Sequence, residues 1–302
     1  MREHIVRIAN KSTILLLGCL SAFAAQAQML GPRQVDALPA SAPTAVVAYG
    51  ADPLQTGELR LPPGKGLFPV AIVIHGGCWT KGYATLKNTA PIASSLAQHG
   101  IATWNIEYRQ QGDPGGGWPG TFLDWGAAAD KLRELAKKYP LDLRRVLGVG
   151  HSAGAHAALW LAARPRLPED SQIRGDDPLP VVAAVAIDGP GDLTGFVGPD
   201  ADICGKPVVA PWMGGTPEQW PERYRQASPL QSLPLGVPQV LVSSVVLSPQ
   251  AAAAYRDAAT AKGDRVRVVS LEGAGHFNML APSDPAWATV QDAILEQMPP
   301  AE

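Results

Sequence analysis

The sequence predicts an α/β fold, with a mostly parallel central sheet, helices on both faces and one irregular, lid-like insertion. Short β-branched runs alternate with longer helical stretches, which is typical of βα units in a parallel sheet. Hydrophobic residues make up 46% of the 302 residues, enough to build one large domain over residues 44–302. A proline-rich stretch interrupts the alternation once. These three observations define the expected architecture.

The first 27 residues are predicted to be a cleaved export signal. A basic start precedes an apolar run, and Ala25 and Ala27 form a small-x-small cleavage site. The apolar run is well under the ~20 residues that span a bilayer, so we expect a periplasmic or secreted protein without a stable membrane span. The alternatives are an uncleaved anchor and lipid attachment at Cys19. Residues 28–43 are rich in Pro and Ala without periodicity and predict a flexible leader.

The secondary-structure elements follow from periodicity and β-branched content. Apolar, β-branched runs predict strands at 46–49, 70–74, 101–105, 145–149, 181–188, 239–243 and 266–271. Longer stretches with helical spacing predict helices near 86–99, 121–138, 153–163, 250–262 and 283–298. Thr121 and Asp124 have the spacing of a capping box at the start of the second helix.

The stretch from 189 to 238 breaks this rhythm. It holds nine prolines, a density that forbids long helices and central strands. In a parallel sheet it emerges at the carboxyl ends of the strands, where ligands bind. We interpret it as a lid or pocket wall, with a solvated loop as the alternative.

One pentapeptide carries the strongest chemical signal. Gly150-His151-Ser152-Ala153-Gly154 lies between a predicted strand and an Ala-rich predicted helix. That context is the strained strand-to-helix turn that exposes a serine hydroxyl above a sheet, and the two glycines allow its close packing. The sequence therefore predicts Ser152 as a nucleophile, and the backbone N–H of Ala153 as a donor to a developing oxyanion.

Two further segments fit the same chemistry. The predicted strand 70–74 runs directly into His75-Gly76-Gly77, the position of an oxyanion loop whose Gly76 and Gly77 N–H groups can point inward. His276 lies on a Gly-x-Gly segment just after the last predicted strand and is the candidate general base. The other five histidines lie in the signal, in these backbone motifs or on predicted helices.

Together these segments resemble a known family. The motifs that carry the resemblance are His75-Gly76-Gly77-Cys78-Trp79, Asn105-Ile106-Glu107-Tyr108-Arg109, Gly150-His151-Ser152-Ala153-Gly154-Ala155-His156 and Gly273-Ala274-Gly275-His276-Phe277. Residues 45–298 look like the esterase/lipase branch of the α/β-hydrolases, near its acyl-peptide-hydrolase-like and kynurenine-formamidase-like members. The resemblance implies an α/β-hydrolase fold, Ser152 as nucleophile, His276 as base, and Gly76, Gly77 and Ala153 as oxyanion donors.

The sequence departs from this family at the third member of the triad. The acid usually follows the strand that corresponds to 239–243, yet no Asp or Glu occurs from Arg223 to Arg256. Asp188 ends the strand after the predicted nucleophile helix, one position along the sheet, and can present a carboxylate to the same histidine. We expect Asp188 to be the acid and Asp192 to be the second choice. The alternative is that Asp188 only starts an Asp-Gly turn.

Some aromatic and sulfur-containing residues have two interpretations. Trp79, Trp118 and Trp212 are candidates to bind substrate, although large aromatics also commonly serve as packing residues. Cys78 and Cys204 remain after removal of the signal, and in an oxidising compartment they can form one disulfide.

The expected function is an exported serine hydrolase that cleaves a small-molecule ester, or an activated amide, through an acyl-enzyme on Ser152. No cofactor is needed for this chemistry, and no zinc-spaced Cys/His cluster suggests a metal. The formal net charge of −2 gives no reason to expect a nucleic-acid partner. The alternatives are a non-catalytic binding protein on the same fold and an exopeptidase-like hydrolase.

Overall fold

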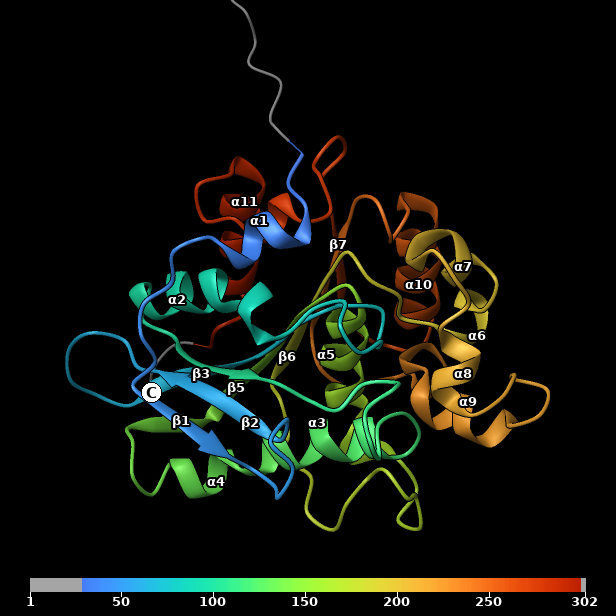
Figure 1. The fold of residues 1–302 in the computed structure, drawn as a ribbon, viewed down its shortest axis with the longest axis horizontal. Helices are drawn as coiled ribbons and strands as arrows, with labels where there is room; N and C mark the ends of the chain where they lie inside the picture. The colour runs from blue at the N-terminus through green and yellow to red at the C-terminus, as the bar shows by residue number, and fades with distance from the viewer. Residues whose placement is uncertain (1–28, 300–302) are drawn as a thin grey trace, which may run out of the picture.

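The computed structural model describes residues 29–299 (Figure 1). An eight-stranded sheet forms its centre, in the order β1-β2-β4-β3-β5-β6-β7-β8. The two pairings β1–β2 and β2–β4 are antiparallel and the others are parallel. The strands are β1 (Ala45–Ala48), β2 (Thr56–Arg60), β3 (Phe68–Ile74), β4 (Ala102–Ile106), β5 (Leu141–His151), β6 (Ala183–Ile187), β7 (Gln239–Ser243) and β8 (Val266–Ser270). The predicted α/β-hydrolase fold is confirmed.

Helices cover both faces of the sheet, as expected for buried parallel strands (Figure 1). One face carries α1 (Pro32–Asp36), α2 (Ala90–Gln98) and α11 (Pro285–Leu295); the other carries α3 (Gly120–Asp130), α4 (Leu132–Leu135), α5 (Ala153–Ala163) and α10 (Pro249–Ala261). Short 3₁₀ turns lie at η1 (Leu86–Asn88), η2 (Arg164–Arg166), η3 (Pro229–Ser232) and η4 (Asn278–Leu280).

The strand β3 shows why the central strands are continuous apolar runs. Val70 and Ile72 pack into the core on the α5 side, whereas Ala71 and Val73 pack into the core on the α2 side. All four side chains are fully buried. Because both faces are covered, alternation of polar and apolar residues disappears along this strand.

One strand was not predicted, and one local expectation is wrong. The strand β2, in which only Leu59 is strongly apolar, lies between β1 and β4. Gly57 leaves room there for the Trp104 ring, which a Cβ would approach within 2.6 Å. The capping box at α3 does not form. Thr121 instead donates to Arg109 O at 2.6 Å and Asp124 accepts from Arg109 Nε at 2.9 Å, so both side chains hold the preceding loop.

The amino-terminal segment also differs from the expectation. The predicted signal, residues 1–27, lies outside the described residues. Residues 29–43, expected to be an irregular leader, include the helix α1, which begins at a proline and buries Val35 completely. Ser41 N donates to Ser94 Oγ at 2.9 Å, which ties the segment to α2. One helical turn with one buried side chain gives no periodicity, so the sequence pattern could not show it.

The segment 189–238 consists of short helices, in agreement with its proline content. They are α6 (Leu193–Phe196), α7 (Pro199–Cys204), α8 (Val209–Met213) and α9 (Pro221–Ala227), and they lie together beside α10 (Figure 1). Pro199 and Pro221 occupy the first turns of α7 and α9, where a missing N–H costs nothing. Within residues 29–299, no helix combines the length and apolar character needed to cross a membrane.

Candidate active site

Ser152 lies in the sharp turn between β5 and α5. Its φ of 58° is in the left-handed region, and its N–H donates to Ile187 O at 2.8 Å, which fixes the turn against β6. Added Cβ atoms would lie 1.9 Å from Gly154 O at Gly150 and 2.1 Å from Ile74 O at Gly154. Both glycines are therefore required by close backbone packing, and the serine is held in a strained conformation by its neighbours.

The loop after β3 lies directly against this turn. A Cβ on Gly76 would lie 2.8 Å from the Ser152 Cβ, and Gly77 has a φ of 101°. Among residues 29–299, neither glycine N–H has a backbone acceptor. The N–H of Ala153, at the first position of α5, has no intrahelical partner either. Gly76 and Ala153 thus adjoin Ser152, and Gly77 lines the same cavity as Ser152.

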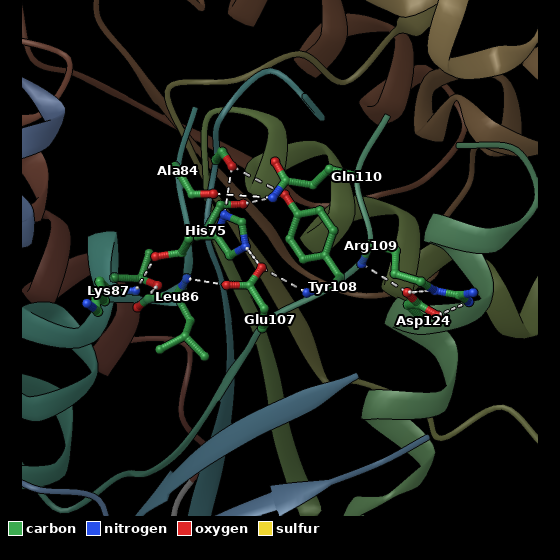
Figure 2. A network of polar contacts seen from close by, with 12 residues as sticks. His75, Ala84, Leu86, Lys87, Glu107, Tyr108, Arg109, Gln110 and Asp124 are labelled. Carbon is green, nitrogen blue, oxygen red and sulfur yellow. Dashed lines mark hydrogen bonds and ion pairs between the residues drawn. The ribbon is translucent and has the colours of Figure 1, made fainter. Parts of the chain in front are cut away.

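A buried polar network supports the same loop from behind (Figure 2). His75 Nε2 lies 2.8 Å from Glu107 Oε1, and Glu107 Oε2 accepts from the Leu86 N–H at 3.0 Å. The Tyr108 hydroxyl donates to His75 O at 2.9 Å, and the two rings stack with centroids 4.4 Å apart. Burial raises the pKa of Glu107. The charge and hydrogen bond of His75 and the N–H groups of Leu86 and Tyr108 lower it by more, so the net pKa is below its usual value. The sequence motifs contained these residues without showing that they contact each other.

Asp188 and His276 lie within hydrogen-bond distance of each other. Asp188 Oδ2 lies 2.7 Å from His276 Nδ1, within the range of 2.6–3.2 Å expected for a triad acid. The carboxylate is completely buried, whereas 16% of the His276 side chain is exposed. Asp188 follows β6 with a φ of 48°, and its N–H donates to Val242 O at 2.8 Å. The strand end therefore aims the carboxylate across β7 toward the loop of His276.

The loop after β7, which lacks an acid, surrounds the Asp188 carboxylate with backbone donors. Oδ1 accepts from the N–H groups of Ser244, Val246 and Leu247 at 3.1, 3.0 and 2.9 Å, and Oδ2 accepts from Val245 N at 3.1 Å. The segment thus binds the displaced carboxylate instead of supplying one. No sequence signal indicated these donors, because backbone N–H groups are present at every non-proline residue.

His276 and these backbone donors together keep Asp188 ionised. Burial alone raises the pKa of this carboxyl, but the hydrogen bond and charge of His276 and the N–H groups of Leu247 and Val246 outweigh it. The net pKa of Asp188 is therefore lowered, and the group is a carboxylate at neutral pH.

The Gly-x-Ser-x-Gly pattern allows any residue at position 151. In this chain His151 holds the loop of His276. Its Nε2 lies 2.9 Å from His276 O, and the two rings pack with centroids 4.2 Å apart. Burial, and then the charge of His276, lower the pKa of His151 to about 3. The His151 ring is neutral at physiological pH, so its Nε2 carries the proton that it donates to the carbonyl.

Ser152 and His276 line one cavity of about 520 Å³, together with Tyr83, Phe277 and residues of α7. Across the described part of the chain, however, no hydrogen bond joins the Ser152 hydroxyl to His276 or to any other residue. The Ser–His hydrogen bond that an esterase mechanism predicts is therefore not formed among these residues.

The three candidate tryptophans lie in different places. Trp79 and Trp212 are buried and stack with centroids 5.0 Å apart, so they belong to the core, although Trp79 also borders a small gap beside Ser152. Trp118 packs against Phe122 with centroids 5.4 Å apart. Neither Trp118 nor Trp212 lines the cavity of Ser152 and His276, so the structure does not bring them to the site. Within residues 29–299, no group of three or more His, Cys, Asp or Glu side chains could hold a metal ion.

The disulfide that the two remaining cysteines allowed is formed. Cys78, next to Gly77, is bonded to Cys204 at the end of α7, with Cα atoms 6.1 Å apart. The bond joins the candidate oxyanion loop to the short-helix segment across 126 residues of sequence, and both cysteines line the cavity.

Removal of this bond is expected to destabilise the domain. A Cys78→Ser/Cys204→Ser variant should lose about 2–5 kcal/mol in the free energy of unfolding, because so long a loop is no longer closed in the unfolded chain. Thermal unfolding of the variant, compared with the wild-type protein with and without reductant, measures the loss. Intact-mass analysis after alkylation is the companion test: two thiols that alkylate freely in the oxidised native protein would contradict the bond.

The fold and the strand–serine–helix turn define the class: this chain is an α/β-hydrolase. The sequence profile of the BD-FAE family matches residues 58–243. The chain belongs to this family of α/β-hydrolase esterases.

A curated relative and solved structures agree with this placement. The chain is 30% identical over 254 residues to "Esterase LipC" of Mycobacterium tuberculosis; the match covers 78% of this chain and 60% of the length of that relative. A truncated carbohydrate esterase from gut microbiota superposes with a TM-score of 0.70 at 19% identity, over 85% of this chain and 99% of the other. Butyrate-bound Est2 of Thermogutta terrifontis superposes with a TM-score of 0.66 at 15% identity, over 85% and 96%. At these identities the two structures show a shared fold.

Proposed function

We propose that this protein is an exported serine esterase that forms an acyl-enzyme on Ser152. The observation that carries the proposal is the 2.7 Å contact between Asp188 Oδ2 and His276 Nδ1, at a cavity that is lined by both His276 and Ser152. The similarity to Esterase LipC and to the carbohydrate esterase from gut microbiota supports the same class of reaction.

The proposed reaction proceeds in two halves. Ser152 Oγ attacks the carbonyl carbon of the ester while His276 Nε2 takes the hydroxyl proton, and the backbone N–H groups of Gly76, Gly77 and Ala153 bind the oxyanion. The tetrahedral intermediate collapses, the C–O bond to the alcohol breaks, and the imidazolium returns its proton to the leaving oxygen. Water, deprotonated by His276, then attacks the acyl-enzyme and releases the acid. Asp188 stabilises the imidazolium without taking its proton.

Export is part of the proposal. The basic and apolar start of the sequence, with its cleavage site after Ala27, supports secretion. The Cys78–Cys204 disulfide supports it independently, because disulfides persist in oxidising compartments such as the periplasm.

One observation favours the second candidate function, a non-catalytic binding protein. Among residues 29–299, no hydrogen bond joins the Ser152 hydroxyl to His276. The wall of the cavity is largely apolar, with Tyr83, Val245 and Phe277 among its residues, so it would also accept an apolar small molecule without reaction.

The two functions are separated by a reaction that requires the activated serine. Purified protein without residues 1–27 is expected to hydrolyse p-nitrophenyl acetate and to react with one equivalent of an organophosphonate, seen as a single mass addition on Ser152. A parallel assay with an aryl formamide and an amino-acid p-nitroanilide tests the amide and exopeptidase-like alternatives. A folded protein that neither turns over an ester nor takes up the label would support the binding protein instead.

A further inference from the structure

Two hollows contact Ser152, and a third lies behind one of them. The open cavity of about 520 Å³ contains His276, and a gap of only about 10 Å³ lies between Ser152, Ala153 and Trp79. A second cavity of about 270 Å³ lies behind this gap, between the loop after β6, the helix α6 and the helix α10. Its lining includes Leu230, Leu241 and Tyr255 and is predominantly apolar.

The reaction chemistry indicates which of the two hollows that contact Ser152 holds the alcohol part of an ester and which holds the acyl part. The leaving oxygen must receive its proton from the imidazolium, so the alcohol part lies on the side of His276. His276 lines the open cavity and does not line the gap. The acyl part therefore lies in the gap, which is bordered by Ala153, one of the oxyanion donors.

Three residues separate the gap from the apolar cavity behind it. Pro190, Phe196 and Val246 line both hollows, so their side chains form a wall one residue thick. The Phe196 ring is 9% exposed and meets the Trp79 ring edge-on, with centroids 6.1 Å apart. A gap of about 10 Å³ has room for about one water-sized group.

We propose that Phe196 and Val246 determine the acyl-chain length of the substrate, and that the cavity behind them is an acyl-binding space closed by this wall. The inference rests on the proposed esterase function and adds its specificity. With the wall in place, the enzyme takes the shortest acyl groups. With the wall removed, an unbranched acyl chain of four or more carbons extends from Ser152 into the apolar cavity.

Phe196 is the better position to test. The backbone N–H of Val246 binds Asp188 Oδ1 at 3.0 Å, so changes there also affect the candidate triad. Phe196 ends the short helix α6, and its side chain has no polar atom that could bind Ser152, His276 or Asp188. Leu230 provides a matched control, because it lines the second cavity without lining the gap.

The test is the ratio of kcat/KM for p-nitrophenyl hexanoate to that for p-nitrophenyl acetate. Wild-type protein and Leu230→Ala should both favour acetate. Phe196→Ala should raise the ratio at least about tenfold, since each methylene moved from water into an apolar site contributes about fourfold. Adding Ala258→Phe, which refills the second cavity, should reverse the gain in Phe196→Ala.

Active-site titration with an organophosphonate keeps the two proposals apart. Phe196 variants that label fully but keep the wild-type preference for the acetate ester would contradict the proposal that this wall determines acyl-chain length. Proteins that never label would instead contradict the esterase function itself. If Phe196→Ala does not fold, Phe196→Val removes part of the ring at lower cost, and an unchanged ratio in that variant counts against the wall equally.

Discussion

The Ser152→Ala variant is expected to lose essentially all ester hydrolysis, about 10⁶-fold in kcat, as when the nucleophile of a serine hydrolase is removed. Alanine retains the Cβ and the backbone strain of the turn, so the fold should remain. Among residues 29–299, the Ser152 hydroxyl has no hydrogen-bond partner, so its removal leaves none of these residues with an unsatisfied partner. Steady-state kinetics on p-nitrophenyl acetate and organophosphonate labelling measure the effect.

Thermal unfolding is the control for this variant. A melting temperature close to that of the wild type, together with loss of labelling, would assign the reaction to Ser152 alone. Residual activity of the order of the oxyanion contribution, about 10³–10⁴ over water, is compatible with the mechanism. Labelling that persists at wild-type stoichiometry in Ser152→Ala would exclude Ser152 as the nucleophile.

The fold was predictable where side chains alone determine burial. The apolar runs at β3, β6 and β7 needed only their own residues, since strands covered on both faces are apolar throughout. The strand β2 was not predictable, because its place depends on the fit of Gly57 to the Trp104 ring of another strand. The helix α1 depends in the same way on a surface formed by α2 and α11.

In the candidate site, too, the residues set by local sequence were predictable, and the contacts between distant segments were not. Ser152 and its flanking glycines follow from a local turn, so the pentapeptide indicated them directly. The position of Asp188 was inferred from the topology, because neighbouring parallel strands end at the same edge of the sheet. The donors that hold its carboxylate are backbone groups of a loop, and no side-chain pattern records them.

The substrate-binding tryptophans were the weakest prediction. Aromatic side chains near a motif serve equally well for packing, and Trp212 stacks on Trp79 inside the core while its Nε1–H binds Thr121 Oγ1 at 3.2 Å. Trp118 and Trp212 line neither hollow that contacts Ser152, whereas Phe196 and Val246, which belong to no sequence motif, line the gap together with Trp79.

The Asp188→Asn variant is expected to lower kcat by about 10⁴ with little change in substrate binding. Oδ1 accepts three N–H groups, so an asparagine keeps its carbonyl oxygen there and turns its NH₂ toward His276 Nδ1. His276 must then accept at Nδ1 and carry its proton on Nε2, on the side of Ser152. That tautomer cannot take the proton of the serine hydroxyl.

The stability of the same variant provides an independent measurement. Its NH₂ also meets the Val245 N–H, which loses its acceptor, so a loss of about 1–3 kcal/mol in the free energy of unfolding is expected near neutral pH. The folded-state pKa of Asp188 is lowered, so the stabilisation by its carboxylate is complete above the unfolded pKa of about 3.9 and is lost as the pH falls through the folded value. The difference in melting temperature between wild type and Asp188→Asn should therefore shrink below about pH 4.

Asp192→Asn is the matched control for the acid. Asp192 caps α6 by accepting the N–H groups of Thr194 and Gly195, both at 3.0 Å, and asparagine caps helices about equally well. Its kcat should stay within a fewfold of wild type. Equal losses in Asp188→Asn and Asp192→Asn would remove Asp188 from the triad. A loss confined to Asp188→Asn, with KM unchanged and a pH-dependent difference in stability, would identify the carboxylate after β6 as the group that orients His276.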